Sequence, residues 1–496
     1  MSLTNQTKNQ HLMWRAGFGP AVEQLGDLSK YSPKQFYKAL VKASDKKPEY
    51  INVADDYLQG LYMGIEEVGR QQQRKELSTD EKKMVQQKNR EGVRNLNIFW
   101  LYEMVNSSAQ LREKMAFFWH GHFACRNLNI FFQQGLLDVI RKNALGNFGT
   151  LLKEISKNAA MLNFLNNQQN RKDHPNENFA REVMELFTLG RGNYTENDVK
   201  EGARAFTGWS ATLKGEYIFR KGQHDFGSKT VLGKTGNFDG GDVLDILLEK
   251  KETAYFITKK LYKFLVHEQV DPEKITWLAD RFYKNEYDIS KLLEDIFTSD
   301  WFYEEKNIGV KIKSPVELLA GIQRMLPMKF EKDEVLLLIQ RSLGQLLFYP
   351  PNVAGWPGGK NWIDSSTLMM RMRIPQMLDD KVEFNIKPKD DDDQMMGRPS
   401  TGLRMNNNDD PKAAAANSMG RLNKPIQVTI DWRLYTKHYE SVPRELLLSN
   451  VTGILLQAKS RVNPELIKQF SDQTGRENFI KTATLQIMST PEYQLC

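Results

Sequence analysis

The stretch from Asn167 to Arg191, NQQNRKDHPNENFAREVMELFTLGR, decides how the centre of this chain folds. Pro175 suits the first turn of a helix and Gly190 suits a left-handed cap, so we expect a helix between them. Its apolar residues recur every three or four positions, which is typical of an amphipathic helix. The same periodicity extends over most of the chain and predicts a mainly α protein, a multi-helical globular bundle.

Two segments interrupt the helical pattern. Residues 217–241 are rich in glycine and alternate apolar with polar side chains, which predicts a small β-hairpin. Residues 387–424 are dominated by Asp, Asn, Met and Ala, which predicts a disordered low-complexity insertion or linker. We therefore expect a main helical domain over residues 1–386 and a C-terminal helical unit over residues 425–496 that packs on it.

Acidic residues follow one stripe of the central helix. Asn178, Glu182 and Glu185 are spaced at i, i+4 and i+7, beside a stripe of apolar residues. Carboxylates at the edge of a core need an arginine, a hydrogen-bond network or a metal ion as partner. Two interpretations stay open: a solvated helix face on which Arg181 pairs with Glu185, or a pair of catalytic carboxylates.

A second cluster is the motif FWHGHF, which contains His120 and His122. If Gly121 loosens the helix, an extended backbone places both imidazoles on one side. The pair then suits a divalent metal ion (zinc, manganese or iron), with His174 as a further ligand. If the helix continues, the two rings point about 200° apart and cannot share an ion. The alternative role is structural, with both histidines hydrogen-bonded among their aromatic neighbours.

His224 and Asp225 stand in a glycine-rich loop, GQHDFGSK. They can form a catalytic base with its orienting carboxylate, and His224 can equally be a metal ligand. A turn stabilised by Asp225 is the structural alternative. In the preceding motif ARAFTGW, we predict that Arg204 and Trp209 bind substrate.

The segment over residues 350–364, PPNVAGWPGGKNWID, contains too much proline and glycine for a helix or a regular strand. Trp356 and Trp362 in this loop can line a groove for a partly polar ligand such as a sugar. The loop can also be latched onto its own core by the same tryptophans. Both interpretations remain open for these two predicted substrate-binding residues.

Composition narrows the class of protein. The chain has 496 residues, a formal net charge of +7 and two cysteines, which do not form a disulfide framework. Its basic residues are scattered, which argues against nucleic acid as a partner. It contains no apolar run long enough to span a membrane, and its first residues contain no apolar signal segment. These features predict a cytoplasmic protein.

Five motifs in order carry a resemblance: HLMWRAGFGP, FWHGHF, HPNENFAREVMELFTLG, ARAFTGW and NVAGWPGG. Together they resemble the bacterial domain-of-unknown-function family eighteen hundred. The resemblance implies a predominantly helical fold, export in many relatives, and a frequently neighbouring gene for a sulfatase-like partner. It implies no settled activity. Many relatives have histidine where this chain has Phe187, so a site that uses that histidine is altered here.

Two classes of function follow. The first is a metal-dependent hydrolase, in which His120 and His122 hold the ion together with His174 or with a carboxylate of Glu182 or Glu185. The unused carboxylate then activates water as a general base. The second is a non-catalytic binding or scaffold protein for the sulfatase-like partner or for a polymer. In that class the histidines and glutamates form a structural polar network.

Overall fold

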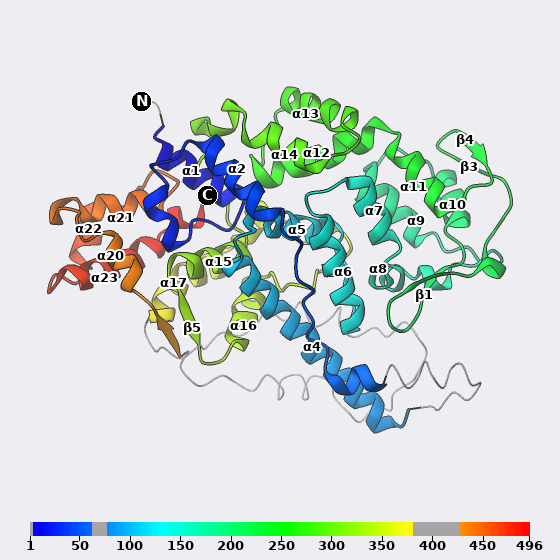
Figure 1. Ribbon diagram of the computed structural model, residues 1–496, viewed down its shortest axis with the longest axis horizontal. Coiled ribbons are helices and arrows are strands. Elements are labelled where there is room, and N and C mark those ends of the chain that lie inside the picture. The colour runs from blue at the N-terminus through cyan, green and yellow to red at the C-terminus, as the bar shows by residue number, and fades with distance from the viewer. Residues whose placement is uncertain (1–2, 62–76, 380–426) are drawn as a thin grey trace. The chain divides into compact units, whose positions relative to one another are not determined.

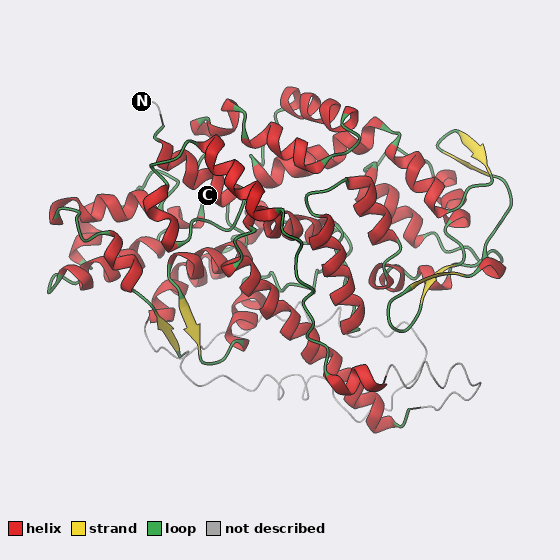
Figure 2. Cartoon of the chain, in the orientation of Figure 1, coloured by secondary structure: helices red, strands yellow, loops and turns green. Residues whose placement is uncertain are grey.

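The computed structural model describes residues 3–61, 77–379 and 427–496 (Figure 1). Most of these residues lie in helices, and the strands in this part of the chain form two-stranded sheets (Figure 2). The predicted mainly α fold is confirmed. The expected disordered insertion, residues 387–424, lies outside the described residues.

The chain divides into two compact units, of which the first contains Met1–Gly19, Asp27–Lys311 and Leu347–Pro357. One segment of this unit, Val183–Thr188, is a π-helical turn that directly continues α9. The helices of the first unit are α1 (Asn5–Arg15), α2 (Pro33–Ser44), α4 (Thr79–Asn106), α5 (Gln110–His122), α6 (Ile130–Asn143), α7 (Phe148–Ser156), α8 (Ala159–Phe164), α9 (Asn178–Glu182), α10 (Glu196–Ala205), α11 (Gly240–Leu248), α12 (Lys251–Leu265), α13 (Pro272–Lys284) and α14 (Ile289–Phe297).

The second unit contains Pro20–Gly26, Ile312–Leu346 and Gly358–Cys496. The C-terminal helices therefore share a compact unit with residues 312–346. The helices of this unit are α15 (Pro315–Met325), α16 (Glu334–Ser342), α17 (Ser365–Asp379), α20 (Arg433–His438), α21 (Leu447–Leu455), α22 (Pro464–Gln469) and α23 (Arg476–Met488).

Local sequence signals explain where several helices begin and end. Ser32 and Thr195 cap α2 and α10, each in a capping box in which side chain and backbone bond reciprocally. Gly190 follows the central helical segment with a φ of 79°, the left-handed conformation that glycine adopts without strain. The helix expected from Pro175 begins later, at Asn178.

In place of the single hairpin predicted over residues 217–241 there are two short hairpins, and the first of them begins before that region. β1 (Trp209–Ala211) pairs antiparallel with β2 (Tyr217–Phe219), and β3 (Lys229–Val231) pairs with β4 (Lys234–Gly236). A third pair, which the sequence did not indicate, joins β5 (Met328–Phe330) to β6 (Val428–Ile430) in the second unit. Each strand has only three residues, so these strand pairs are minor additions to units that are built from helices.

A buried carboxylate links three helices of the first unit. Glu113 of α5 is fully buried and accepts a hydrogen bond from Trp100 Nε1 of α4 at 3.0 Å. Arg141 of α6 forms a fork with it, donating from Nε at 3.0 Å and from Nη2 at 2.9 Å. Arg112 Nε donates a further bond at 3.1 Å. These charge-assisted bonds compensate for removing the carboxylate from water.

Two further features are the state of the cysteines and the apolar character of the helices. Cys125 and Cys496 are both buried and neither forms a disulfide. Among the described helices, none combines the length and the apolar character that crossing a membrane requires.

We expect Glu113→Gln to lower the free energy of unfolding by about 3–5 kcal/mol, because it leaves the Arg141 guanidinium buried without its full anionic partner. Glu103→Gln is the matched control, since Glu103 also accepts from Arg141 but its side chain is 43% exposed. The control should cost about 1 kcal/mol or less. Urea unfolding of both variants checks this, and equal losses would contradict the assigned role of Glu113.

Candidate functional site

The two histidines of FWHGHF lie on one continuous helix. α5 ends at His122, so the backbone at Gly121 is helical and the extended arrangement is wrong. The imidazoles consequently face different sides of α5, as the helical alternative predicts. In this geometry they cannot chelate one ion together.

His120 lies in an aromatic cage. Its ring centroid is 5.0 Å from that of Trp100, 4.9 Å from Phe348 and 5.5 Å from Trp356. Its Nε2 accepts a hydrogen bond from the Phe348 N–H at 3.2 Å, so the ring proton is on Nδ1. Burial lowers the pKa of His120 to about 3, which keeps the ring neutral near neutral pH.

His122 faces the π-helical turn. Its Nε2 lies 3.2 Å from the Phe187 carbonyl oxygen, and because a carbonyl only accepts, the ring donates from Nε2. Its Nδ1 is buried without a hydrogen-bond partner among the described residues. Burial, followed by the positive charge of Lys260, holds the pKa of His122 well below 6.5. Phe187, the position at which many relatives are expected to carry histidine, therefore contacts His122 directly.

His174 does not join the other two histidines. It is exposed in a turn, where its backbone N–H bonds to the Arg171 carbonyl oxygen at 2.9 Å, whereas His120 and His122 are buried. Within the described ranges there is no group of three or more His, Cys, Asp or Glu side chains placed to hold a metal ion. The predicted three-histidine ligand set is thus not assembled by this fold.

Glu185 is held in place by two neighbours that follow it in sequence. Arg191 donates to its Oε1 from Nε at 3.0 Å and from Nη2 at 2.7 Å, and the Tyr194 hydroxyl donates to its Oε2 at 2.5 Å. The bond from Tyr194 and then that from Arg191 lower the pKa of Glu185. The expected Arg181 partner is wrong, since Arg181 pairs with Glu177 and Glu196.

Glu182 differs from Glu185 in having no such partners. It is half-buried, and no hydrogen bond or ion pair joins its carboxylate to another residue in the described part of the chain. Burial and then the negative charge of Glu185 raise the pKa of Glu182. It lies immediately before the π-helical turn, a type of distortion that is frequent at functional sites.

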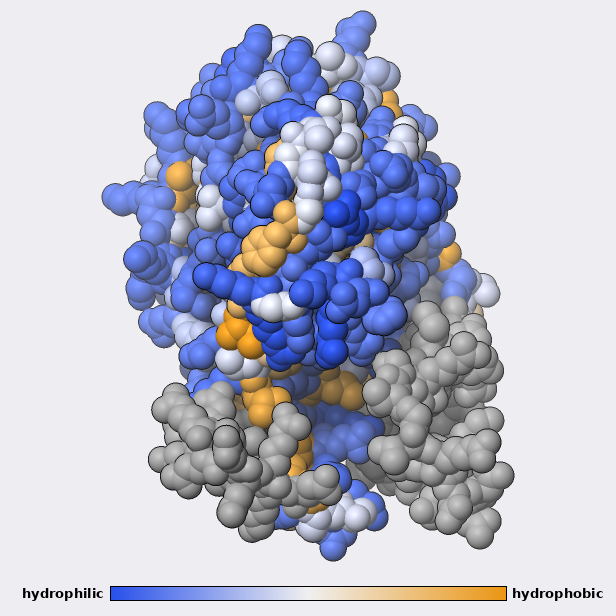
Figure 3. Space-filling model, turned by 90° about the vertical axis from the view of Figure 1, so that its right-hand side faces the viewer, coloured by the Kyte–Doolittle hydropathy of each residue, from blue (hydrophilic) through white to orange (hydrophobic). Residues whose placement is uncertain are grey.

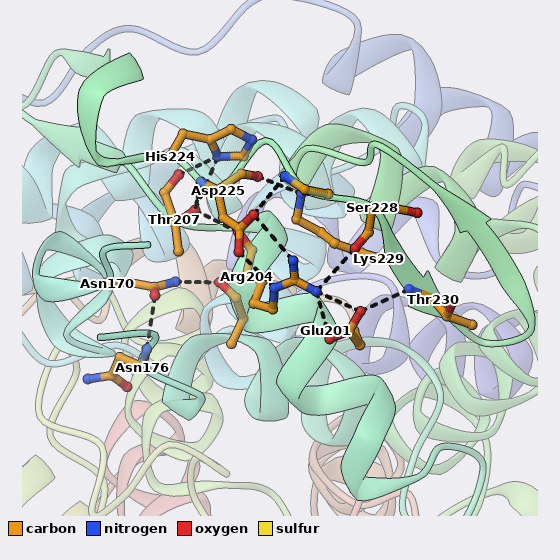
Figure 4. Close-up of polar contacts among 12 residues, drawn as sticks. Asn170, Asn176, Glu201, Arg204, Thr207, His224, Asp225, Ser228, Lys229 and Thr230 are labelled. Atoms are coloured by element: carbon orange, nitrogen blue, oxygen red, sulfur yellow. Dashed lines mark hydrogen bonds and ion pairs between the residues drawn. The ribbon is translucent and has the colours of Figure 1, made fainter. Parts of the chain in front are cut away.

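His224 is oriented by the backbone of Thr207, not by Asp225 (Figure 4). Its Nδ1 lies 2.9 Å from the Thr207 carbonyl oxygen, so the proton is on Nδ1. Its Nε2 carries a lone pair and makes no hydrogen bond with another described residue. The predicted pairing of His224 with an orienting Asp225 carboxylate is wrong.

The Asp225 carboxylate forms an ion pair with Arg204 instead. It donates from Nε at 2.7 Å and from Nη2 at 3.3 Å, and its Nη1 bonds both Glu201 oxygens at 2.9 and 3.0 Å (Figure 4). Lys229 Nζ bonds the carbonyl oxygen of Asp225 at 2.6 Å. The Arg204 hydrogen bond is the largest cause of the lowered pKa of Asp225. Arg204 and Asp225 therefore anchor the loop that carries His224.

The predicted ligand-binding tryptophans lie in different surroundings. Trp209 is 3% exposed and packs edge-on against Phe206 and Tyr217. Trp362 is 6% exposed. The faces of both rings are therefore covered by the protein itself. Trp356 is half-buried beside His120 and belongs to the first unit, whereas Trp362 belongs to the second.

Sequence reasoning missed the residues that fix these groups. Arg191 and Tyr194 hold Glu185, and Thr207 orients His224. All three stand within or next to the motifs already singled out. A search for hydrogen-bond donors within ten residues of each carboxylate would have included Arg191 and Tyr194, but no periodicity indicates Thr207.

Buried neutral histidines make stability depend on pH. Because the folded-state pKa values of His11, His120 and His122 lie below the ordinary 6.5, the unfolded chain binds protons that the folded chain excludes. The contribution of these histidines to stability is fully present above about pH 6.5. As the pH drops below that value, each of them lowers the free energy of unfolding by about 1.4 kcal/mol per pH unit, and for His120 this continues to about pH 3. His120→Gln removes one of these histidines. Its free energy of unfolding, measured with urea at about pH 7 and about pH 5, should therefore fall less than that of the wild type, by the contribution of one histidine. An unchanged slope would contradict the role of His120.

The helical geometry of α5 also predicts the outcome of metal analysis. The purified protein should hold no stoichiometric divalent ion through His120 and His122, and a chelator should leave its Tm unchanged. Elemental analysis with a thermal scan checks this. A stoichiometric ion that is lost in His122→Phe would contradict it.

Neither a curated protein nor a protein of solved structure matches the chain. Residues 11–495 match the profile of the family described as "Protein of unknown function (DUF1800)", so the resemblance carried by the five motifs is confirmed and the chain belongs to that family.

Proposed function

We propose that the protein is a hydrolase that uses Glu182 and Glu185 as an acid–base pair, without an ion shared by His120 and His122. The observation that carries this proposal is the asymmetry of the two carboxylates. Glu185 is fixed by Arg191 and Tyr194, whereas Glu182 has no hydrogen-bond partner within the described residues. A carboxyl group without a structural partner is available to a ligand.

The shifts of the two pKa values agree with separate roles. Burial raises the pKa of Glu182, so it retains its proton closer to neutral pH, as a general acid must. Hydrogen bonds from Tyr194 and Arg191 lower the pKa of Glu185, so it stays ionised and can accept a proton from water or stabilise positive charge. Two carboxyl groups whose surroundings move their pKa values apart are the usual basis of acid and base assignments.

The chemistry of such a pair is hydrolytic. Glu182 donates its proton to the leaving-group oxygen of a glycosidic or ester bond as that bond breaks. Water supplies the hydroxyl group to the other fragment, and its released proton returns to the carboxylate pair. Atoms and charge balance without a further reactant.

We expect Glu182→Gln to lower kcat by about a hundredfold or more on whichever substrate the wild type hydrolyses, because a general acid typically contributes 10²–10⁴. Its Tm should stay near that of the wild type, since Glu182 loses no partner. A panel of chromogenic glycosides and esters tests this. Glu196→Gln is the matched control, because it breaks an exposed pair with Arg181 and should leave kcat unchanged.

The pH profile separates this role from a structural one. Activity should fall as the pH rises through the raised pKa of Glu182, and Glu185→Gln should abolish the acidic limb of the profile. Full activity in Glu182→Gln would overturn the proposal. A wild type that hydrolyses nothing in the panel would favour the non-catalytic binding or scaffold class instead.

A further inference from the structure

His224 lies between two solvent-exposed phenylalanines. Its ring centroid is 5.1 Å from that of Phe219 and 4.7 Å from that of Phe226, both edge-on. Phe219 is 36% exposed and Phe226 is 58% exposed, although His224 itself is buried. Large apolar rings exposed in a group are more informative than single ones, because such groups mark interaction sites. We call residues 219–226 the His224 loop.

The His224 loop is held by close backbone contacts and hydrogen bonds to neighbouring segments. Gly208 has a φ of 81°, and a Cβ there would come within 2.7 Å of the Arg220 carbonyl oxygen, so the loop packs directly on the Gly208 backbone. The Lys172 N–H bonds to Gln223 O at 2.9 Å, and the Asp225 N–H bonds to Thr207 Oγ1 at 2.8 Å. A loop fixed in this way loses little conformational entropy when a ligand binds.

The polar group between the rings is a hydrogen-bond acceptor. Because Thr207 O takes the Nδ1 proton, Nε2 of His224 presents a lone pair. This nitrogen can therefore accept a hydrogen bond from a ligand that carries a hydrogen-bond donor, such as a hydroxyl group. Apolar faces beside a hydrogen-bonding group suit sugars, whose C–H faces stack on aromatic rings while their hydroxyls bond at the edges.

The charge of the surface is positive. The His224 loop contains two basic side chains, Arg220 and Lys221, against one acidic side chain, Asp225. Arg220 and Lys221 are exposed, and neither forms an ion pair with another described residue. The nearby Asp225 carboxylate is already paired with Arg204. The surface therefore complements a ligand that carries carboxylate or other anionic groups.

We propose that the His224 loop binds an acidic saccharide, with sugar rings on Phe219 and Phe226, a hydroxyl on His224 Nε2, and the anionic groups on Arg220 and Lys221. Figure 3 views the side of the molecule on which α10, β3 and β4 lie in Figure 1, and apolar residues form a strip across hydrophilic surface there. A single-stranded nucleic acid would use the same rings and cations, but a DNA backbone lacks the hydroxyl donors that Nε2 calls for. The site stands whether or not Glu182 is catalytic.

Titration calorimetry with the full chain tests the proposal. A galacturonate oligosaccharide is the probe, and a maltooligosaccharide and a single-stranded oligodeoxynucleotide are the comparators. The galacturonate should bind most tightly, and Phe226→Ala should weaken its Kd about tenfold or more. Replacing both Arg220 and Lys221 by alanine should weaken binding and remove most of its dependence on salt concentration.

Two matched controls keep the test specific. Phe470→Ala removes a phenylalanine of the second unit that is 67% exposed, and replacing both Lys332 and Lys437 by alanine removes the same charge from other exposed positions. Both controls should bind like the wild type. The proposal is overturned if the galacturonate does not bind, if Phe226→Ala binds as the wild type does, or if the oligodeoxynucleotide binds more tightly.

Discussion

The buried carboxylate of Glu113 is the interaction on which the first unit depends. It joins α4 through Trp100 and α6 through the Arg141 fork, and it does so from the first turn of α5. Three helices whose apolar faces could slide past one another are thereby given one register, because a displaced helix would leave an ion unpaired in the interior. Arg141 extends the same constraint to the Glu49 backbone, to which it donates at 2.8 Å.

This constraint decides what the FWHGHF motif can do. With α5 fixed in the core, its last turn is buried, and His120 and His122 lie among aromatic rings on different sides. Burial keeps both rings neutral, so they serve as polar contacts to backbone groups of neighbouring segments. The residues to which we assign roles in the two proposals lie elsewhere, at the start of the π-helical turn and in the His224 loop.

The helical class, the caps at Ser32 and Thr195, and the left-handed Gly190 could be predicted because each depends on residues close in sequence. Gly121 shows where local rules fail. Its weak helix propensity suggested a break, yet the burial of the aromatic residues around it keeps α5 helical. The partner of Glu185 was missed for a related reason, since a π-helical turn changes the register on which i, i+4 pairing relies.

The histidines also show why adjacency in sequence does not assign a chemical role. Asp225 follows His224 directly, but Arg204 binds the carboxylate and Thr207 orients the ring. The result is a tautomer opposite to that of His122. His122 donates from Nε2, and its Nδ1 is buried in the core without a hydrogen-bond partner among the described residues. His224 donates from Nδ1, and its ring lies beside two exposed phenylalanines. One backbone carbonyl at each site thus decides which ring nitrogen carries the proton.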